Sequence, residues 1–494
     1  VNAKGIVPNN KYDRYNFTFR NTTKFLKDKI TLDVSAGYIK QKDRNMINQG
    51  TYNNPLVGAY LFPRGNDWEE IKLYERYDPA RKIYTQYWPV GAAGMTMQNP
   101  YWVNYRNLRT NNKDRYMMSA SLNYQILEWL SVSGRVRMDN SNNDYEEKFF
   151  ASTNTQLTES SERGLYGITH TADKQLYADF LININKMFGE DWSLQANFGG
   201  SLSDLRSNST KVRGPIADGS IPGEKVGLTN FFAIQHLSPS KTERVQAGWR
   251  EQTQSLFASA ELGYKSTYYL TLTGRNDWPS QLAGPNSKSK SFFYPSVGLS
   301  FVLSELIPNL PQDYLSYIKL RGSFASVGVA FERFLANPHY NWDSATGNWS
   351  PTTSYPMYNL KPERTKSYEF GLTMRFLKNF NLDLTYYNTK TMNQTFDPQL
   401  GVSGWSSIYI QTGAVRNQGF ELSLGYKNTW NKFTWDTGYT FSTNKNKILS
   451  LADNVINPAT GERFSISTLN MGGLGETRFL LREGGSMGDR LTSR

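Results

Sequence analysis

Few residues of this chain are spaced as a catalytic or metal-binding site requires. The three histidines, His170, His236 and His339, do not stand at a spacing typical of metal ligands, and there are no cysteines. Residues 139–144 are rich in carboxylate and amide oxygens but lack the glycine and closing glutamate of a calcium loop, so we interpret them as an Asn-rich turn. The Gly-rich residues 471–476 have no strand–helix context that would make them a phosphate loop. We therefore expect no enzyme activity, no metal and no cofactor.

Aromatic side chains in the long polar segments are the better candidates for binding. Stacking on an aromatic ring beside hydrogen-bonding groups is a common way to hold a sugar or a peptide. The alternatives are packing within the loop and docking onto another protein. The candidates lie in segment 42–113 and in two later predicted loops: Trp68, Tyr87, Trp88, Tyr101, Trp102, Trp342, Trp349 and Trp405.

Arg275 and Asp277 form a second, weaker candidate site. They alternate on one face at the end of a predicted strand, where both side chains could hydrogen-bond a substrate. The alternative is an ion pair within the wall of the protein, which would leave neither group for a ligand.

The elements that carry these residues are expected to be β-strands. In segment 414–443, Phe420, Leu422, Leu424 and Tyr426 alternate with small or polar residues, and the alternation resumes after a short turn at Phe433. A period of two places these apolar side chains on one face of a strand. The same pattern predicts seven hairpins: 13–24 with 29–41, 114–125 with 130–140, 174–186 with 192–203, 252–264 with 268–277, 292–303 with 315–326, 365–376 with 380–391, and 414–427 with 432–443.

The connections between these strands alternate between short and long. Short turns join the members of a pair, and long polar excursions, above all 42–113, 204–251 and 327–364, join one pair to the next. Aromatic residues crowd the short turns, and charges such as Asp179 and Asp383 fall on the face opposite the apolar row. These features predict a transmembrane antiparallel up-and-down β-barrel with long extracellular loops. A soluble β-sandwich is the alternative, although its strands are commonly shorter than these.

The high content of aromatic residues is more typical of a membrane β-barrel than of a soluble enzyme. The chain has 494 residues with 12 Trp, 31 Tyr and 27 Phe, and a formal net charge of +12. The basic residues are spread along the chain, so we expect no nucleic-acid partner; loops facing anionic lipopolysaccharide, or an acidic partner, would explain the charge equally well. The sequence begins at Val1 without a signal-peptide pattern, and we expect secretion from the barrel pattern alone.

Several motifs resemble the barrel core of SusC/RagA-type TonB-dependent transporters of the outer membrane. They occur in the expected order over nearly the whole chain: 99–102 (NPYW), 129–135 (WLSVSGR), 272–280 (LTGRNDWPS), 293–301 (FYPSVGLSF), 360–371 (LKPERTKSYEFG) and 413–422 (GAVRNQGFEL). The resemblance implies that residues 1–494 form one partial barrel domain of an expected barrel of about 22 strands. On this interpretation the N-terminal plug and the closing C-terminal strands are absent from the sequence.

The resemblance also implies a function. Such barrels import an oligomeric nutrient, an oligosaccharide or a peptide, across the outer membrane of a Bacteroidota-like bacterium, with energy delivered by TonB through the plug. A SusD-like surface lipoprotein acts as a lid, and lipids and lipopolysaccharide surround the barrel. A passive porin, or a secretion or assembly barrel without substrate coupling, is the alternative function.

Overall fold

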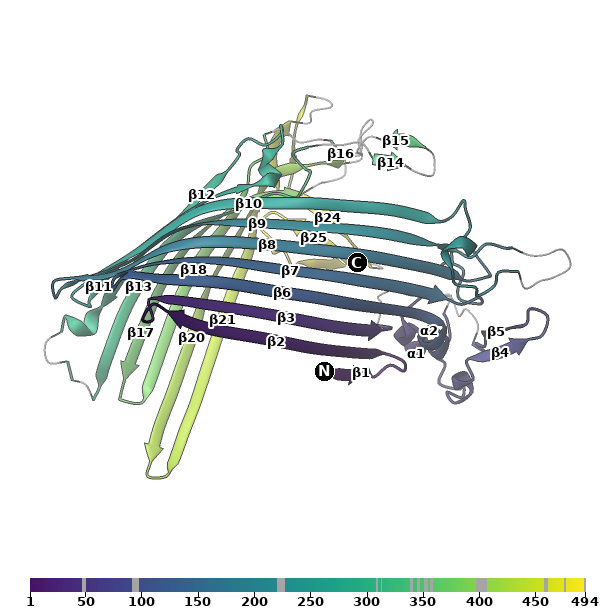
Figure 1. Ribbon diagram of the computed structural model, residues 1–494, viewed down its shortest axis with the longest axis horizontal. Coiled ribbons are helices and arrows are strands. Elements are labelled where there is room, and N and C mark those ends of the chain that lie inside the picture. Colours follow the sequence, from purple (N-terminus) through teal and green to yellow (C-terminus); the bar gives the residue numbers. More distant parts are fainter. Residues whose placement is uncertain are drawn as a thin grey trace.

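A single curved antiparallel sheet forms most of the molecule (Figure 1). The computed structural model describes residues 1–46, 50–90, 97–219, 227–307, 310–311, 313–337, 341–343, 347–350, 354–355, 359–396, 407–456, 461–474 and 477–492. Fifteen strands follow one another in chain order across the sheet. They are β1 (Asn2–Lys4), β2 (Lys11–Phe25), β3 (Ile30–Arg44), β6 (Asn107–Leu127), β7 (Leu130–Phe149), β8 (Leu165–Phe188), β9 (Trp192–Pro215), β10 (Glu243–Tyr264), β11 (Tyr268–Pro279), β12 (Phe292–Val302), β13 (Leu315–Val329), β17 (Glu363–Phe376), β18 (Phe380–Phe396), β20 (Ile410–Trp430) and β21 (Phe433–Ser450).

The remaining elements are short and lie in the connections. They are α1 (Pro55–Tyr60), η1 (Glu70–Lys72), β4 (Glu75–Asp78), β5 (Ile83–Gln86), α2 (Pro100–Arg106), η2 (Ile234–His236), η3 (Ser280–Ala283), η4 (Leu303–Glu305), β14 (Asn341–Asp343), β15 (Asn348–Ser350), β16 (Ser354–Tyr355), β19 (Ser407–Ile408), β22 (Ala452–Ile456), β23 (Arg463–Ile466), β24 (Thr468–Leu474), β25 (Thr477–Arg482) and β26 (Arg490–Thr492). Within the described part of the chain, no helix is long and apolar enough to cross a membrane.

All seven predicted hairpins are present. Each predicted pair is a pair of neighbouring antiparallel strands, from β2–β3 to β20–β21, and the three-residue β1 is an additional strand at one edge. The short turns lie together at one end of the strands, and the long excursions begin at the other end (Figure 1). The up-and-down arrangement expected from the sequence is therefore confirmed.

Several strands are longer than predicted. The central strands β6 to β10 have 20 to 24 residues each, so parts of the predicted loops 42–113 and 204–251 are strand. The prediction of an Asn-rich turn at residues 139–144 is wrong, because this segment lies inside β7. His170 lies inside the neighbouring strand β8. In the extensions of β6, β7 and β9 polar residues predominate on both faces, so the period-two pattern fades there while the backbone ladder continues.

The two faces of the sheet differ in chemistry. One face carries exposed apolar side chains, among them Phe17, Phe370 and Phe441, which are 64%, 60% and 48% exposed. The other face carries charged groups that pair between strands; for example, Arg135 Nη2 lies 2.6 Å from Asp179 Oδ2. The predicted placement of Asp179 opposite the apolar row is confirmed. We refer to these surfaces as the apolar face and the polar face.

Candidate functional site

A folded group of loops covers the ends of the long strands opposite the short turns (Figure 1). We call residues 50–90 and 97–106, together with residues 150–163 and 227–242, the loop cap. It contains α1, α2, η1, η2 and the β4–β5 hairpin. Its position at the end of the strands makes it the first surface that a molecule approaching from that side would meet.

Trp102 fastens the loop cap to the strands. Asn99 caps α2 by accepting a hydrogen bond from the Tyr101 backbone N–H at 2.9 Å, and Pro100 occupies the first helical turn, where its missing N–H costs nothing. The helix directs Trp102 inward, where it is fully buried and its Nε1 donates to Thr153 Oγ1 at 3.0 Å. No part of Trp102 is exposed to a ligand, so this predicted binding residue has a packing role in the structure.

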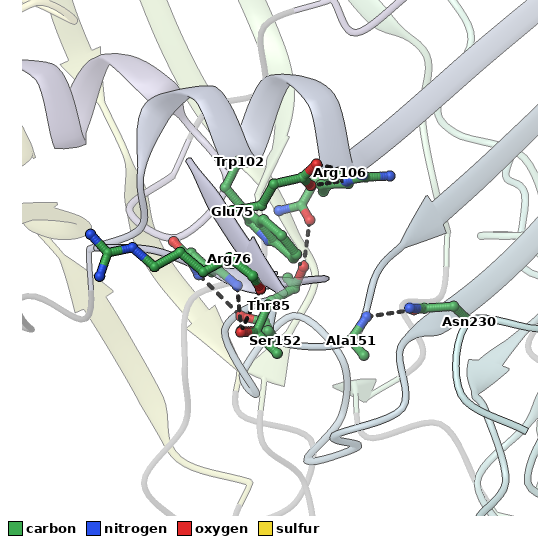
Figure 2. Close-up of polar contacts among 11 residues, drawn as sticks. Glu75, Arg76, Thr85, Trp102, Arg106, Ala151, Ser152 and Asn230 are labelled. Atoms are coloured by element: carbon green, nitrogen blue, oxygen red, sulfur yellow. Dashed lines mark hydrogen bonds and ion pairs between the residues drawn. The ribbon is translucent and has the colours of Figure 1, made fainter. Parts of the chain in front are cut away.

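A bidentate ion pair joins α2 to the β4–β5 hairpin (Figure 2). Arg106 donates from Nε to Glu75 Oε2 at 2.6 Å and from Nη2 to Glu75 Oε1 at 2.9 Å. These hydrogen bonds to the carboxylate raise the pKa of the Arg106 guanidinium above its ordinary value. The guanidinium also lies over the Phe150 ring, 4.9 Å from its centroid, which ties both elements to the next loop of the cap.

Backbone contacts connect the remaining loops of the cap. The Gln86 backbone N–H donates to Ser152 Oγ at 2.9 Å. The neighbouring Ala151 N–H donates to Asn230 Oδ1 at 2.7 Å (Figure 2). The described parts of three long connections, which start at β3, β7 and β9, are therefore held together as one body. A surface on this body is preorganised rather than assembled on contact.

Three of the predicted aromatic residues meet in the loop cap. Phe62 packs edge-on against Trp68 with ring centroids 5.1 Å apart, and lies 6.0 Å from Trp88. Trp68 in turn lies 6.2 Å from Tyr101. All four rings are half-buried, so each keeps part of its surface open. We call Phe62, Trp68, Trp88 and Tyr101 the aromatic cluster. Phe62 was not among the predicted residues, although its aromatic character within segment 42–113 was the signal that marked the others.

Tyr87 lies in the cap but is already engaged within the protein. Its phenol donates a hydrogen bond to Glu70, which raises the pKa of Tyr87, and the Arg76 guanidinium lies 3.4 Å from the centroid of its ring. This ring face is thus occupied by a cation–π contact. A ligand would have to displace Arg76 to stack on it.

The other predicted tryptophans lie elsewhere. Trp342 in β14 and Trp349 in β15 face each other across a small hairpin, with ring centroids 5.2 Å apart, and remain 54% and 65% exposed. Trp405 lies outside the described residues. The hairpin that carries Trp342 and Trp349 lies outside the residues of the loop cap and is a second exposed aromatic surface.

Arg275 and Asp277 form an ion pair in the sheet. Arg275 Nε lies 2.8 Å from Asp277 Oδ1, and Arg275 Nη2 donates to Ser255 Oγ at 2.8 Å. The Tyr294 hydroxyl donates a second hydrogen bond to Asp277, which is only 9% exposed. The geometry is that of an ion pair in the wall, the alternative interpretation of these two residues.

Metal-binding geometry is not found among the described residues, where no group of three or more His, Asp or Glu side chains could hold an ion. His170 Nδ1 instead lies 2.7 Å from Asp144 Oδ1 on the neighbouring strand.

Comparison with known proteins identifies the family of this sheet. A family model described as "TonB dependent receptor-like, beta-barrel" matches residues 67–489. The chain belongs to this family. The apolar face of this TonB-dependent receptor barrel therefore lies against the lipid of the outer membrane, and the polar face lines the lumen.

Curated relatives from Formosa agariphila share the family. TonB-dependent receptor P26 is 25% identical over 467 residues, which are 91% of this chain and 43% of that protein. TonB-dependent receptor P3 is 24% identical over 393 residues, which are 76% of this chain and 37% of that protein. The chain thus spans less than half the length of the relatives it matches.

Solved structures show the same fold. The RagAB peptide transporter superposes with a TM-score of 0.71 at 15% identity, covering 96% of this chain and 50% of that chain. The ferric-catecholate import receptor Fiu of E. coli superposes with a TM-score of 0.51 at 12% identity, covering 97% and 65%. The resemblance to SusC/RagA-type barrels that the sequence motifs indicate is confirmed at the level of family and fold.

Proposed function

We propose that the protein of which this TonB-dependent receptor barrel is part imports an oligomeric nutrient, an oligosaccharide or a peptide, across the outer membrane. Energy comes from TonB acting through a plug domain within the lumen. A SusD-like surface lipoprotein closes over the loop cap as a lid. Residues 1–494 supply part of the barrel wall and the extracellular surface that first meets the substrate.

The aromatic cluster is the observation that carries this proposal. Trp68, Trp88 and Tyr101 expose ring surface on a loop body that is anchored to the strand ends by Trp102 and by the Glu75–Arg106 pair. Rigid aromatic surface binds sugars and peptides at a low cost in conformational entropy. This position, at the extracellular mouth of the barrel, is where a substrate would be held before it enters the lumen.

The polar face supports passage of a polar cargo. Ion pairs such as Arg135–Asp179 and Arg321–Asp383 place charged and hydrogen-bonding groups along the lumen while satisfying each other. A lumen of this kind stays hydrated and offers weak, replaceable contacts rather than one tight site. Such a wall suits transport better than permanent binding.

The exposed hairpin with Trp342 and Trp349 fits a docking surface for the lid. Its two rings are more exposed than those of the aromatic cluster, and they lie on a separate short hairpin. Exposed tryptophans are enriched where one protein surface meets another. We therefore assign substrate contact to the aromatic cluster and lid contact to this hairpin.

The test is isolation of the intact protein from outer membranes in mild detergent, with mass spectrometry of companion proteins and bound small molecules. We expect a surface lipoprotein and an oligosaccharide or a peptide, and the bound molecule identifies the substrate class. An empty barrel with neither lid nor plug would contradict the proposal and favour a passive porin or an assembly barrel.

A further inference from the structure

Three cations stand side by side on the apolar face. They lie between the apolar side chains of this face and the long loops. Lys174 of β8 lies directly opposite Arg206 of β9, and Arg206 lies directly opposite Arg250 of β10. All three side chains are exposed. Like charges directly opposite each other on neighbouring strands destabilise a sheet, so a row of three needs a compensating anion. We call Lys174, Arg206 and Arg250 the cation row.

The protein supplies only part of that compensation. Asp204 accepts from Arg206 Nε at 2.9 Å and from Arg250 Nη2 at 2.5 Å, so one carboxylate serves two guanidinium groups. Among the ion pairs of the described residues, none includes Lys174. The row therefore keeps a net positive charge and exposed donors that point away from the barrel.

A long groove lies on the same face, between the cation row and the short turns. It has a volume of about 1270 Å³ and crosses seven neighbouring strands from β11 to β3. Six strand spacings correspond to a length of roughly 29 Å. Small residues such as Gly134 and Ala178 line it together with Leu122, Phe180 and Leu256. Its lining is mostly apolar, as an acyl chain requires.

The groove and the cation row are continuous along the strands. Ala178, Leu202 and Gln254 line the groove, and the three cations lie four residues further along the same three strands, hence on the same face. Trp278 and Lys290 also line the groove. The Lys290 ammonium donates to the Ala283 and Gly284 carbonyl oxygens at 3.3 and 2.9 Å. These hydrogen bonds hold a further cation beside the end of the groove that lies towards the long loops.

The height of the cation row matches the phosphate layer of the outer leaflet. Each cation lies fourteen residues from the end of its strand at the short turns, at Phe188, Trp192 and Tyr264. With the usual strand tilt this is a rise of roughly 36 Å, whereas the apolar band of such barrels is about 25 Å tall. The row thus stands just above the hydrocarbon, on the side of the long loops.

We infer that this surface is a binding site for lipopolysaccharide, with a lipid A phosphate on the cation row and an acyl chain in the groove. Lipid A of the outer leaflet is a phosphorylated sugar that carries acyl chains. Its phosphate lies nearer the outside than its acyl chains, just as the cation row lies nearer the long loops than the groove does. Arginine pairs with phosphate through two parallel hydrogen bonds, so Arg206 and Arg250 are the principal anchors. The inference depends on the position of the barrel in the outer membrane and not on the proposed import.

The experiment uses the full-length protein purified from outer membranes and measures bound lipid A by native mass spectrometry, followed by titration with purified lipopolysaccharide after delipidation. The variant Lys174→Gln/Arg206→Gln/Arg250→Gln removes the cation row. We expect an affinity loss on the order of a hundredfold, since each basic residue near a membrane surface contributes about one tenfold step or slightly less. The control Lys24→Gln/Lys378→Gln/Lys427→Gln removes the same charge from exposed lysines near the short turns and should bind as the wild type does.

A second variant tests the groove without changing any charge. A β-carbon at Gly134 would lie 3.9 Å from its nearest neighbour, so Gly134→Leu places an added side chain in the groove without a clash at its β-carbon. We expect it to fold normally and to bind lipid A about tenfold more weakly, because the leucine side chain occupies space that one or two methylene groups of the acyl chain would fill. Equal lipid A binding by the wild type and the cation-row variant would overturn the inference. Equally tight binding of an anionic phospholipid in place of lipopolysaccharide would overturn it as well.

Discussion

Arg321 on β13 and Asp383 on β18 form a bidentate ion pair although β17 lies between their strands. Arg321 Nη2 lies 2.9 Å from Asp383 Oδ1, and Nη1 lies 3.0 Å from Oδ2. The residue opposite Arg321 on β17 is Gly371, and a side chain there would overlap the guanidinium. The missing side chain lets one ion pair span three strands, which fixes their relative position on the lumen side.

Substituting Gly371 should break this three-strand contact. In Gly371→Val the new side chain displaces the Arg321 guanidinium, and we expect the free energy of unfolding to fall by about 1 kcal/mol, because both charged groups are only partly shielded from water. The measurement is the unfolding transition in detergent. Gly438→Val is the matched control, since a β-carbon at Gly438 meets no described atom within 4 Å. Equal stability of Gly371→Val and the wild type would mean that the pair does not hold the strands.

Removing Trp102 should loosen the loop cap and leave the sheet intact. Trp102→Ala deletes a fully buried ring and the hydrogen bond to Thr153, and such truncations cost about 3–5 kcal/mol. We expect faster hydrogen exchange and proteolysis in residues 50–90 and 97–106, with unchanged exchange in the strands of the sheet. Trp349→Ala, which removes a ring that is 65% exposed, should leave the cap as it is. Unfolding of the whole barrel by Trp102→Ala would contradict the local role.

The Glu75–Arg106 pair should couple two elements of the cap. Its side chains are only 22% and 26% exposed, so a double-mutant cycle with Glu75→Gln and Arg106→Gln should give a coupling free energy of about 1–3 kcal/mol. The exposed pair Asp313–Lys378, 69% and 62% exposed, is the comparison and should give less than about 1 kcal/mol. If both cycles gave the same value, burial would not explain the strength of the cap contact.

The sequence predicts the sheet far better than the cap. Strands such as β21 alternate Phe433, Trp435 and Tyr439 with polar residues because one side meets lipid, and that period is visible without a structure. The extensions of β6, β7 and β9 beyond the membrane carry mainly polar residues on both faces, so their ends could not be predicted. The reason is physical. The alternation of side chains depends on whether each face of a strand meets lipid or water, whereas the length of a strand depends on its backbone hydrogen bonds.

The candidate site could be predicted by residue type but not by arrangement. Aromatic residues in segment 42–113 mark the cap, yet nothing in their spacing separates buried Trp102 from half-buried Trp68. That separation depends on contacts between loops distant in sequence, such as Trp102 with Thr153. The spacing of Arg275 and Asp277 allowed a wall ion pair or a ligand contact, and only the position of Tyr294 on the next strand favours the ion pair.

Trimming the aromatic cluster should weaken substrate capture. Trp68→Ala and Trp88→Ala each remove one stacking surface, and we expect about a tenfold loss in substrate affinity per ring, with normal amounts of folded protein in the outer membrane. Tyr77→Ala is the control, because this ring is 56% exposed in the same cap but packs against Tyr84 outside the cluster. Equal loss in all three variants would assign the effect to general disturbance of the cap.

Uptake by intact cells distinguishes energised import from passive diffusion. The labelled substrate is the oligomer that co-purifies with the protein, and its uptake is followed with and without a protonophore that removes the energy source of TonB. We predict saturable uptake that stops when the proton gradient collapses and falls in Trp68→Ala and Trp88→Ala. Uptake that continues unchanged without the gradient would contradict energised import and identify the barrel as a passive pore.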